Sequence, residues 1–189
     1  MDLDKAIKTR ISVRDFLNKK PDWRKILRAI DAARFAPMAG NLFNLKFIVV
    51  KDEKQINKLK EACQQDFVAA PYIVVVVSNP EKATRNYDER GEKYTKQQAG
   101  AAIENFLLAL NQEGLSTCWT GHFVDEQVKK ILELPDKMDV EGIFPIGIAS
   151  KDRTKRQVKT KIELDDILYF DKWDNKYLEP KTKTSIEGS

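Results

Sequence analysis

The chain has 189 residues, 42% of them hydrophobic and 33% charged, and its 33 basic and 29 acidic residues give a net charge of +4. A chain of this size builds one domain with a sizeable core, and this composition is that of a globular protein with a heavily charged surface. The small positive excess attracts anions mildly and is too diffuse to indicate a nucleic-acid partner.

The cysteines and the apolar runs indicate the compartment. Cys63 and Cys118 are the only cysteines and do not have the spacing of a metal site, so we expect neither a disulfide framework nor a bound metal. No apolar run approaches the roughly 20 residues that cross a bilayer. The first five residues lack the core of a signal peptide. We therefore expect a cytoplasmic protein without a membrane partner.

Helices and strands are expected to alternate along the chain. Apolar periodicity and end signals predict helices over 2–9, 23–34, 53–62, 92–113 and 126–132, and strands over 46–50, 73–77, 115–119 and 142–149. Asp2, Asp22 and Asp125 are the candidate N-caps, and Gly114 ends the longest helix. The order of these elements predicts an α+β sandwich with a central mixed sheet flanked by helices.

Two of the expected strands have positions that can be predicted. The run 73–77 is continuously β-branched or apolar, which is typical of a central strand covered on both faces. Pro145 lacks the N–H that a ladder needs, so it indicates that the strand over 142–149 lies at an edge or contains a bulge.

Arg10, Ser12 and Arg14 alternate with β-branched residues near the amino terminus. In an extended segment, side chains at this spacing point to the same side. Two guanidinium groups with a hydroxyl between them would then present a fork of donors to an anion such as a phosphate. The alternative is that the arginines are solvated residues that close a short helix, where the helix dipole favours them.

No side-chain motif for nucleophilic or metal chemistry occurs. His122 is the only histidine, and neither a zinc-protease motif nor a phosphate-binding loop motif is present. The lack of acid–base machinery is typical of an enzyme whose cofactor supplies the chemistry.

Four motifs in register resemble the nitroreductase family of FMN-dependent oxidoreductases, and the match runs from about Ala6 to about Trp173. The motifs are Arg10-Ile11-Ser12-Val13-Arg14, Ala36-Pro37-Met38-Ala39-Gly40-Asn41, Ala101-Ala102-Ile103-Glu104-Asn105 and Gly114-Leu115-Ser116-Thr117-Cys118-Trp119-Thr120-Gly121. The resemblance implies FMN as cofactor, NAD(P)H as electron donor, and a nitroaromatic, a quinone or a similar small molecule as acceptor, with ping-pong kinetics.

The resemblance also assigns phosphate and ring contacts. It implies that Arg10 and Ser12 contact the phosphate and the ribityl chain, and that Arg14 lies beside flavin N1 and O2, where reduction builds negative charge. Lys159 and Lys161 match a basic pair that closes over the phosphate. Lysine stands at 161 where arginine is common, which weakens a bidentate grip.

Further cofactor contacts are implied from other segments. Gln65 resembles an amide that meets the pyrimidine edge, although the adjacent Gln64 fits the same role. Thr120 and Gly121 match the turn whose backbone N–H faces flavin N5. Glycine there keeps a Cβ away from the ring.

The loop Pro37, Met38, Ala39 and Asn41 matches the family loop that lies against the cofactor bound mainly by the other subunit. The sequence departs from the family here, because Met38 stands where serine is usual and Phe43-Asn44-Leu45 stands where Gln-Pro-Trp is usual. One side-chain hydrogen bond to the flavin is therefore in question.

Tyr87, Arg90 and Tyr94 match a segment over the open face of the flavin, so they are candidate substrate contacts; surface aromatics at a helix start are the alternative.

We expect residues 1–189 to form a single domain and a homodimer, with the basic loop and tail from about 151 to 189 embracing the partner subunit. Two alternatives to an enzyme are a flavin-binding or storage protein without turnover and a basic nucleic-acid-binding module that uses residues 151–161.

Overall fold

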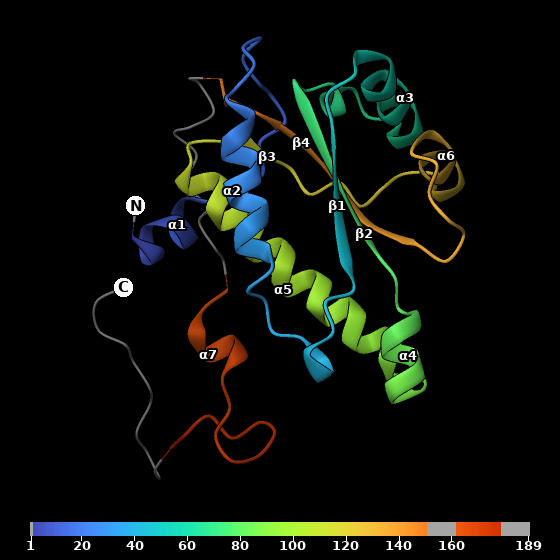
Figure 1. The fold of residues 1–189 in the computed structure, drawn as a ribbon. Helices are drawn as coiled ribbons and strands as arrows, with labels where there is room; N and C mark the ends of the chain where they lie inside the picture. Colours follow the sequence, from blue (N-terminus) through green and yellow to red (C-terminus); the bar gives the residue numbers. More distant parts are fainter. Residues whose placement is uncertain (1, 151–161, 179–189) are drawn as a thin grey trace. The chain divides into compact units, whose positions relative to one another are not determined.

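The computed structural model describes residues 2–150 and 162–178. Contacts divide the chain into two compact units, Met1–Gln157 and Val158–Ser189. The first unit has helices on both faces of a four-stranded sheet (Figure 1). The expected α+β sandwich is confirmed.

The helices of the first unit are α1 (Leu3–Thr9), α2 (Trp23–Ala33), α3 (Glu53–Cys63), α4 (Glu81–Tyr87), α5 (Arg90–Gln112) and α6 (Asp125–Ile131), with 3-10 turns η1 (Ala39–Asn41) and η2 (Asp66–Val68). The strands are β1 (Leu45–Val50), β2 (Tyr72–Ser78), β3 (Ser116–Thr117) and β4 (Asp139–Gly147). All expected helices and strands are present, and α4 is an additional helix that the sequence did not predict.

The strands lie in the order β1-β2-β4-β3, and every neighbouring pair is antiparallel. One parallel bridge joins Ser12 to Thr117 beyond β3, so the segment that carries the arginine fork is attached to the sheet. This bridge is what makes the sheet mixed.

Two cores lie on opposite faces of β2. Val74 and Val76 pack in the core beneath α2 and α5, whereas Ile73, Val75 and Val77 pack in the core beneath α3 and α6. All five side chains are buried. Successive residues of a strand point to opposite faces, so a strand buried on both faces needs an apolar run without alternation. The central position predicted for this run is confirmed.

For the proline-containing strand the sequence predicted an edge position or a bulge; the edge position is wrong, whereas the pairing of this strand with β2 does contain a register shift. β4 lies between β2 and β3, and Pro145 is paired with Ile73 of β2. The backbone groups of Ile143 bond to Thr120, so by alternation those of Pro145 face the same side. The ladder to β3 ends at Thr117 and is interrupted there, which shortens β3 from the expected five residues to two. Pro145 is tolerated in β4 because its missing N–H falls where the hydrogen bonds between β4 and β3 are already interrupted. A register shift lies further along the same pairing, at Val76 and Val77.

Helix ends follow the expected caps with one exception. The Asp2 and Asp22 carboxylates accept hydrogen bonds from the Lys5 and Arg24 backbone N–H groups, at 2.8 and 3.0 Å. Asp125 is instead the first residue of α6, whose N-cap is Val124. An acidic residue in the first turn still favours the helix through the dipole.

The described part of the second unit contains one short helix, α7 (Leu164–Ile167), which begins with a capping box between Glu163 and Asp166. The Tyr169 and Trp173 rings pack with centroids 4.8 Å apart. Trp173 is nevertheless 84% exposed, so this unit presents an uncovered aromatic side chain. Embracing of a partner subunit by the tail stays a prediction.

Candidate functional site

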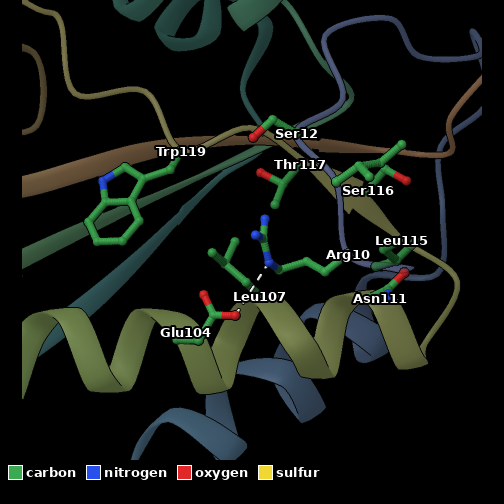
Figure 2. Close-up of a pocket in the computed structure, with 10 residues that line it drawn as sticks. Arg10, Ser12, Glu104, Leu107, Asn111, Leu115, Ser116, Thr117 and Trp119 are labelled. Atoms are coloured by element: carbon green, nitrogen blue, oxygen red, sulfur yellow. Dashed lines mark ion pairs between the residues drawn. The ribbon is translucent and has the colours of Figure 1, made fainter. Parts of the chain in front are cut away.

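A cavity of about 190 Å³ lies between the amino-terminal extended segment, α5 and β3. Figure 2 shows Arg10 extending along it, with Glu104 of α5 on one side and Ser12 and Thr117 on the opposite, sheet side. Trp119 also lines this cavity. The two residues that the sequence assigned to a phosphate, Arg10 and Ser12, are therefore brought together in one cavity.

Local structure explains the direction of these side chains. Val13 is 3% exposed, and its N–H donates to the Thr117 carbonyl at 2.9 Å, which fixes the segment on the sheet. With Val13 directed into the core, alternation along an extended segment turns Ser12 away from the core.

Arg10 is held on one side by an acidic residue of α5. Its Nε lies 3.3 Å from Glu104 Oε1, and both side chains are partly exposed. The end of the guanidinium points away from α5 toward Thr117 (Figure 2). The cavity thus carries one positive and one negative side chain, and the terminal nitrogens of the positive one face the sheet side.

Arg14, the second arm of the expected fork, does not line this cavity. Its guanidinium carbon lies 5.4 Å from the centre of the Phe67 ring, in a cation–π contact at an exposed position. The structure therefore separates the two arginines, with Arg10 in the cavity and Arg14 beside η2.

Gln65 lies directly before η2, and its side-chain amide donates to the His122 carbonyl at 3.4 Å. This contact connects the segment of Gln65 with the one that follows Gly121. The Thr120 N–H donates to the Ile143 carbonyl at 3.0 Å, so it is occupied within the sheet. A Cβ placed on Gly121 would meet no atom within 4 Å, so the backbone there borders open space. Of the two residues, Gly121 is the one whose amide suits a ligand.

A second cavity of about 250 Å³ lies between the loop before β1 and the first part of α5. Pro37, Met38 and Ala39 line it together with Tyr94. The structure therefore places a candidate substrate residue against the loop that resembles the family's cofactor loop.

The aromatic pair Tyr87 and Tyr94 packs edge to face, with ring centroids 5.3 Å apart and an interplanar angle of 82°. A Cβ on Gly40 would lie 2.5 Å from the Tyr87 hydroxyl, so the loop approaches this ring closely. Gly40 and Asn41 both have positive φ angles, 58° and 55°, which suit glycine and asparagine. Arg90, the first residue of α5, is exposed beside this pair.

A buried polar network that the sequence did not reveal holds this loop. Gln98 accepts from the Asn44 N–H and donates to the Leu42 carbonyl, both at 2.8 Å. Thr95 accepts from the Asn44 side chain at 3.3 Å. Polar residues inside an alanine-rich helix were the available hint, but only the tertiary structure shows what they bind.

Trp119 is fixed from the far side of the cavity. Its indole N–H donates to the Glu141 carbonyl at 3.2 Å, and the Glu141 carboxylate pairs with Lys96 at 2.8 Å. Burial alone would lower the pKa of Lys96, but its bonds to Glu141 and Asp139 outweigh burial and raise that pKa. The lysine therefore stays charged and holds the end of β4 against α5.

The two cavities lie toward different ends of α5. Gln98 is the last residue of α5 that lines one cavity and Glu104 is the first that lines the other, and these six residues of helix span roughly 9 Å. The arginine segment and the loop 37–41 thus border different cavities of one chain. Lys159 and Lys161 lie outside the described residues, so the basic pair is not placed.

Among residues 2–150 and 162–178, no group of histidine, cysteine and acidic side chains could hold a metal ion. Within the same ranges, no helix is both long and apolar enough to cross a membrane. Cys63 and Cys118 are free and buried, and burial raises the pKa of Cys63 to about 11, which keeps that thiol protonated.

A mixed sheet covered by helices on both faces, with a cavity at its margin that holds the ion pair of Arg10 and Glu104, defines the fold class as α+β. The chain belongs to the nitroreductase family, whose sequence profile matches residues 7–70 and 60–148.

Relatives and solved structures agree with this family. A protein of Archaeoglobus fulgidus, named for NADH dehydrogenase or NAD(P)H nitroreductase activity, is 28% identical over 175 residues, covering 89% of this chain and 97% of its own length. A nitroreductase family structure from Clostridium novyi NT is 28% identical and covers 96% of this chain and 100% of its own, with a TM-score of 0.73. Another, from Clostridium difficile 630, is 27% identical and covers 91% and 99%, with a TM-score of 0.79.

Proposed function

We propose that this chain is an FMN-dependent oxidoreductase that takes electrons from NAD(P)H and passes them to a small acceptor. The observation that carries the proposal is the cavity in which Arg10 and Ser12 face the same space, in a chain of the nitroreductase family. A guanidinium and a hydroxyl suit a phosphate monoester. The chain has no glycine-rich dinucleotide fingerprint, which favours FMN over FAD.

Each part of this cofactor has a proposed partner in the chain. Arg10 and Ser12 would bind the phosphate and the ribityl chain. Arg14 would lie beside the pyrimidine edge, with Gln65 as its amide neighbour. The Gly121 backbone borders open space, as a residue beside a flat ring must. Lys159 and Lys161 are proposed to close over the phosphate.

The site requires two copies of the chain. Pro37, Met38 and Ala39 line the second cavity, and we propose that this loop, with Asn41, reaches the cofactor held by the fork of a second copy. We therefore propose a homodimer, with the carboxyl-terminal tail embracing the partner. The exposed Trp173 supports this role, because contact with another copy would cover it.

Acceptor binding is assigned to the tyrosine pair. Tyr87 and Tyr94 lie next to the loop 37–41 and would come with it to the open face of the cofactor. Aromatic side chains suit flat acceptors such as nitroaromatics and quinones. Arg90, exposed at the same helix start, would attract an anionic group of the substrate.

FMN supplies two-electron transfer when bound, and the chain's residues bind it and tune it. With one stacking face open, the nicotinamide nucleotide has to leave before the acceptor enters, which gives ping-pong kinetics. His122 takes no part in proton transfer in this scheme. A reducing cytoplasm is the compartment that suits such an enzyme.

Two measurements test the proposal. Heating the purified protein should release FMN and not FAD, as identified by chromatography. NADH or NADPH should then be oxidised in the presence of a quinone, with parallel double-reciprocal lines at several acceptor concentrations. A colourless protein that cannot be reconstituted with FMN would refute the proposal. Bound FMN without turnover would instead indicate a flavin-binding or storage protein.

A further inference from the structure

The hydroxyl of Thr117 is buried without a hydrogen-bond partner among the described residues. Thr117 is only 7% exposed and stands on β3, in the wall of the Arg10 cavity. A buried donor without a partner is costly, and such groups in folded proteins usually have an explanation in ligand binding or function. This hydroxyl is therefore a candidate for a ligand contact.

Thr117 is attached to the sheet through its backbone, whereas its side-chain hydroxyl has no hydrogen-bond partner among the described residues. The Thr117 carbonyl accepts from Val13, and the residue pairs with Ile146 of β4 on one side and with Ser12 on the other. The backbone that carries this hydroxyl is therefore held in place before any ligand arrives. Binding to it costs little ordering of the protein.

The neighbours of this hydroxyl define the chemistry of its ligand. Thr117 projects toward the end of Arg10, and Ser12 lies beside it on the sheet side (Figure 2). The negatively charged Glu104 of α5 lies on the side of Arg10 opposite Thr117. A cation and two hydroxyls together present donors to an oxygen-rich anion, for which a phosphate group is the matching ligand.

We propose that Thr117 is a phosphate-binding residue, whose hydroxyl donates a hydrogen bond to a phosphate oxygen beside Arg10. The proposal rests on the proposed function in so far as that phosphate belongs to FMN. Thr117 stands next to the segment 118–121 that borders the proposed ring position, so one strand end would contact both ends of the cofactor. Thr117 distinguishes a phosphorylated flavin from an unphosphorylated one.

The test compares three variants as full-length proteins freed of flavin. Thr117→Val removes the hydroxyl and keeps the shape, whereas Thr117→Ser keeps the hydroxyl. The control for stability is Thr95→Val, because Thr95 is also a buried threonine but its hydroxyl donates to Gly91 at 2.9 Å and accepts from Asn44. Flavin fluorescence quenching gives the FMN dissociation constant, and thermal unfolding gives the stability of the flavin-free protein.

We expect Thr117→Val to weaken FMN binding roughly ten- to hundredfold, as for a hydrogen bond to a charged group. Thr117→Ser should keep most of the affinity. The melting temperature of flavin-free Thr117→Val should not fall, because its hydroxyl has no protein partner to lose, whereas that of Thr95→Val should fall. Unchanged FMN affinity in Thr117→Val, or a loss of stability equal to that of Thr95→Val, would overturn the proposal.

Inorganic phosphate separates this proposal from the proposed function. It should raise the melting temperature of the wild-type protein and raise that of Thr117→Val less. If the wild-type protein binds no FMN but shows this phosphate effect, the proposed function fails while the role of Thr117 stands. If the wild-type protein and Thr117→Val bind FMN equally, the role of Thr117 fails while the proposed function stands.

Discussion

Charges around Arg10 set how strongly its cavity attracts a phosphate. Glu104 lies 3.3 Å from Arg10 Nε, so a bound anion would share the cavity with a carboxylate. Glu104→Gln keeps an oxygen that accepts from Nε and removes the negative charge. We expect FMN affinity to rise roughly three- to tenfold, because charges a few Å apart near water interact by about 1 kcal/mol. Titration of flavin fluorescence gives the change.

Glu113 is the matched control for Glu104, because it lies on the same side of the sheet near the end of α5 and pairs with Arg28 at 2.8 Å. Glu113→Gln should leave FMN affinity unchanged. Weaker FMN binding in Glu104→Gln would show instead that the carboxylate is needed to hold Arg10 in position.

Arg14 and His122 test which side chain influences the flavin electronically. Arg14→Ala removes a fixed cation proposed to lie beside the pyrimidine edge, so it should lower the flavin reduction potential and slow reduction by NAD(P)H. A charge-assisted hydrogen bond contributes roughly 1.5–3 kcal/mol, which corresponds to about a ten- to hundredfold change in the equilibrium constant for flavin reduction. His122→Ala should change little, because only the backbone carbonyl of His122 makes a described contact with Gln65. Stopped-flow reduction with the opposite ranking would refute these roles.

Single residues show where sequence reasoning reaches its limit. Spacing predicted that Arg10, Ser12 and Arg14 share one side, because alternation in an extended segment is a local property; the structure brings Arg10 and Ser12 together and places Arg14 beside Phe67 instead. Glu104 and Thr117 stand in recognised motifs, yet their roles depend on α5 and β3 meeting across one cavity. Pairing between segments so far apart in sequence has no local signature, so neither residue was identified as part of the site.

The contact between α4 and α5 depends on a glycine. A Cβ on Gly91 would lie 2.3 Å from the Thr84 backbone nitrogen and 2.4 Å from the Ala83 carbonyl carbon, and backbone atoms cannot move aside as a side chain can. Gly91→Ala should therefore destabilise the protein by about 1–3 kcal/mol or more. Because this contact also positions Tyr87 near Tyr94, the acceptor KM should rise.

Lys93→Ala serves as the comparison, since Lys93 is exposed on the same turn of α5. Its stability should stay within about 0.5 kcal/mol of the wild-type value. Equal denaturation midpoints for Gly91→Ala and the wild-type protein would mean that α4 does not pack as closely as described.

The ion pair between α2 and α5 predicts a pH dependence of stability. Arg28 donates to Glu113 through two nitrogens, at 2.8 Å each, and this hydrogen bonding lowers the pKa of Glu113 below its ordinary value of 4.5. A carboxyl with a lowered folded-state pKa stabilises the fold above pH 4.5 and loses that contribution as pH falls through the folded pKa. The stability difference between wild type and Arg28→Gln should therefore be constant above pH 4.5 and shrink below it.

Thermal unfolding from pH 7 down to pH 3 measures this difference, with Lys93→Gln as the control for loss of one positive charge. A difference between wild type and Arg28→Gln that grows on acidification would contradict the sign of the linkage.

Elements with a strong local pattern could be predicted, and elements decided by tertiary context could not. The run 73–77 was correctly predicted to lie inside the sheet, because a run of apolar residues without polar alternation indicates burial on both faces. The strand with Pro145 was misplaced at an edge, since the sequence does not show that the ladder opposite the proline is interrupted. The short α4 has Pro80 as its N-cap, and the Asn79 side chain accepts from the Glu81 N–H instead, so the helix start lacks the usual N-cap residue.

At the scale of the whole molecule, the candidate site is divided between two places on one chain. The fork at Arg10 and the loop at Ala39 line different cavities, toward opposite ends of α5. The resemblance assigns the loop to the cofactor of the other subunit, and a site shared between two subunits stays a prediction. Composition and periodicity could not predict such a site, since they describe one chain at a time.

Subunit complementation tests the shared site most directly. Arg10→Ala damages the fork, and Ala39→Trp fills the loop cavity; each homodimer should therefore bind FMN poorly. In mixed dimers formed by refolding the two variants together, one site combines both defects and the other has neither. Half of the dimers are mixed in a random 1:2:1 assembly, so about a quarter of all sites should regain wild-type FMN affinity. FMN bound per chain, measured by absorbance after gel filtration, should rise to that level in the mixture. A mixture that binds no more FMN than the separate variants, or a monomer that holds FMN tightly, would contradict a site shared between two copies.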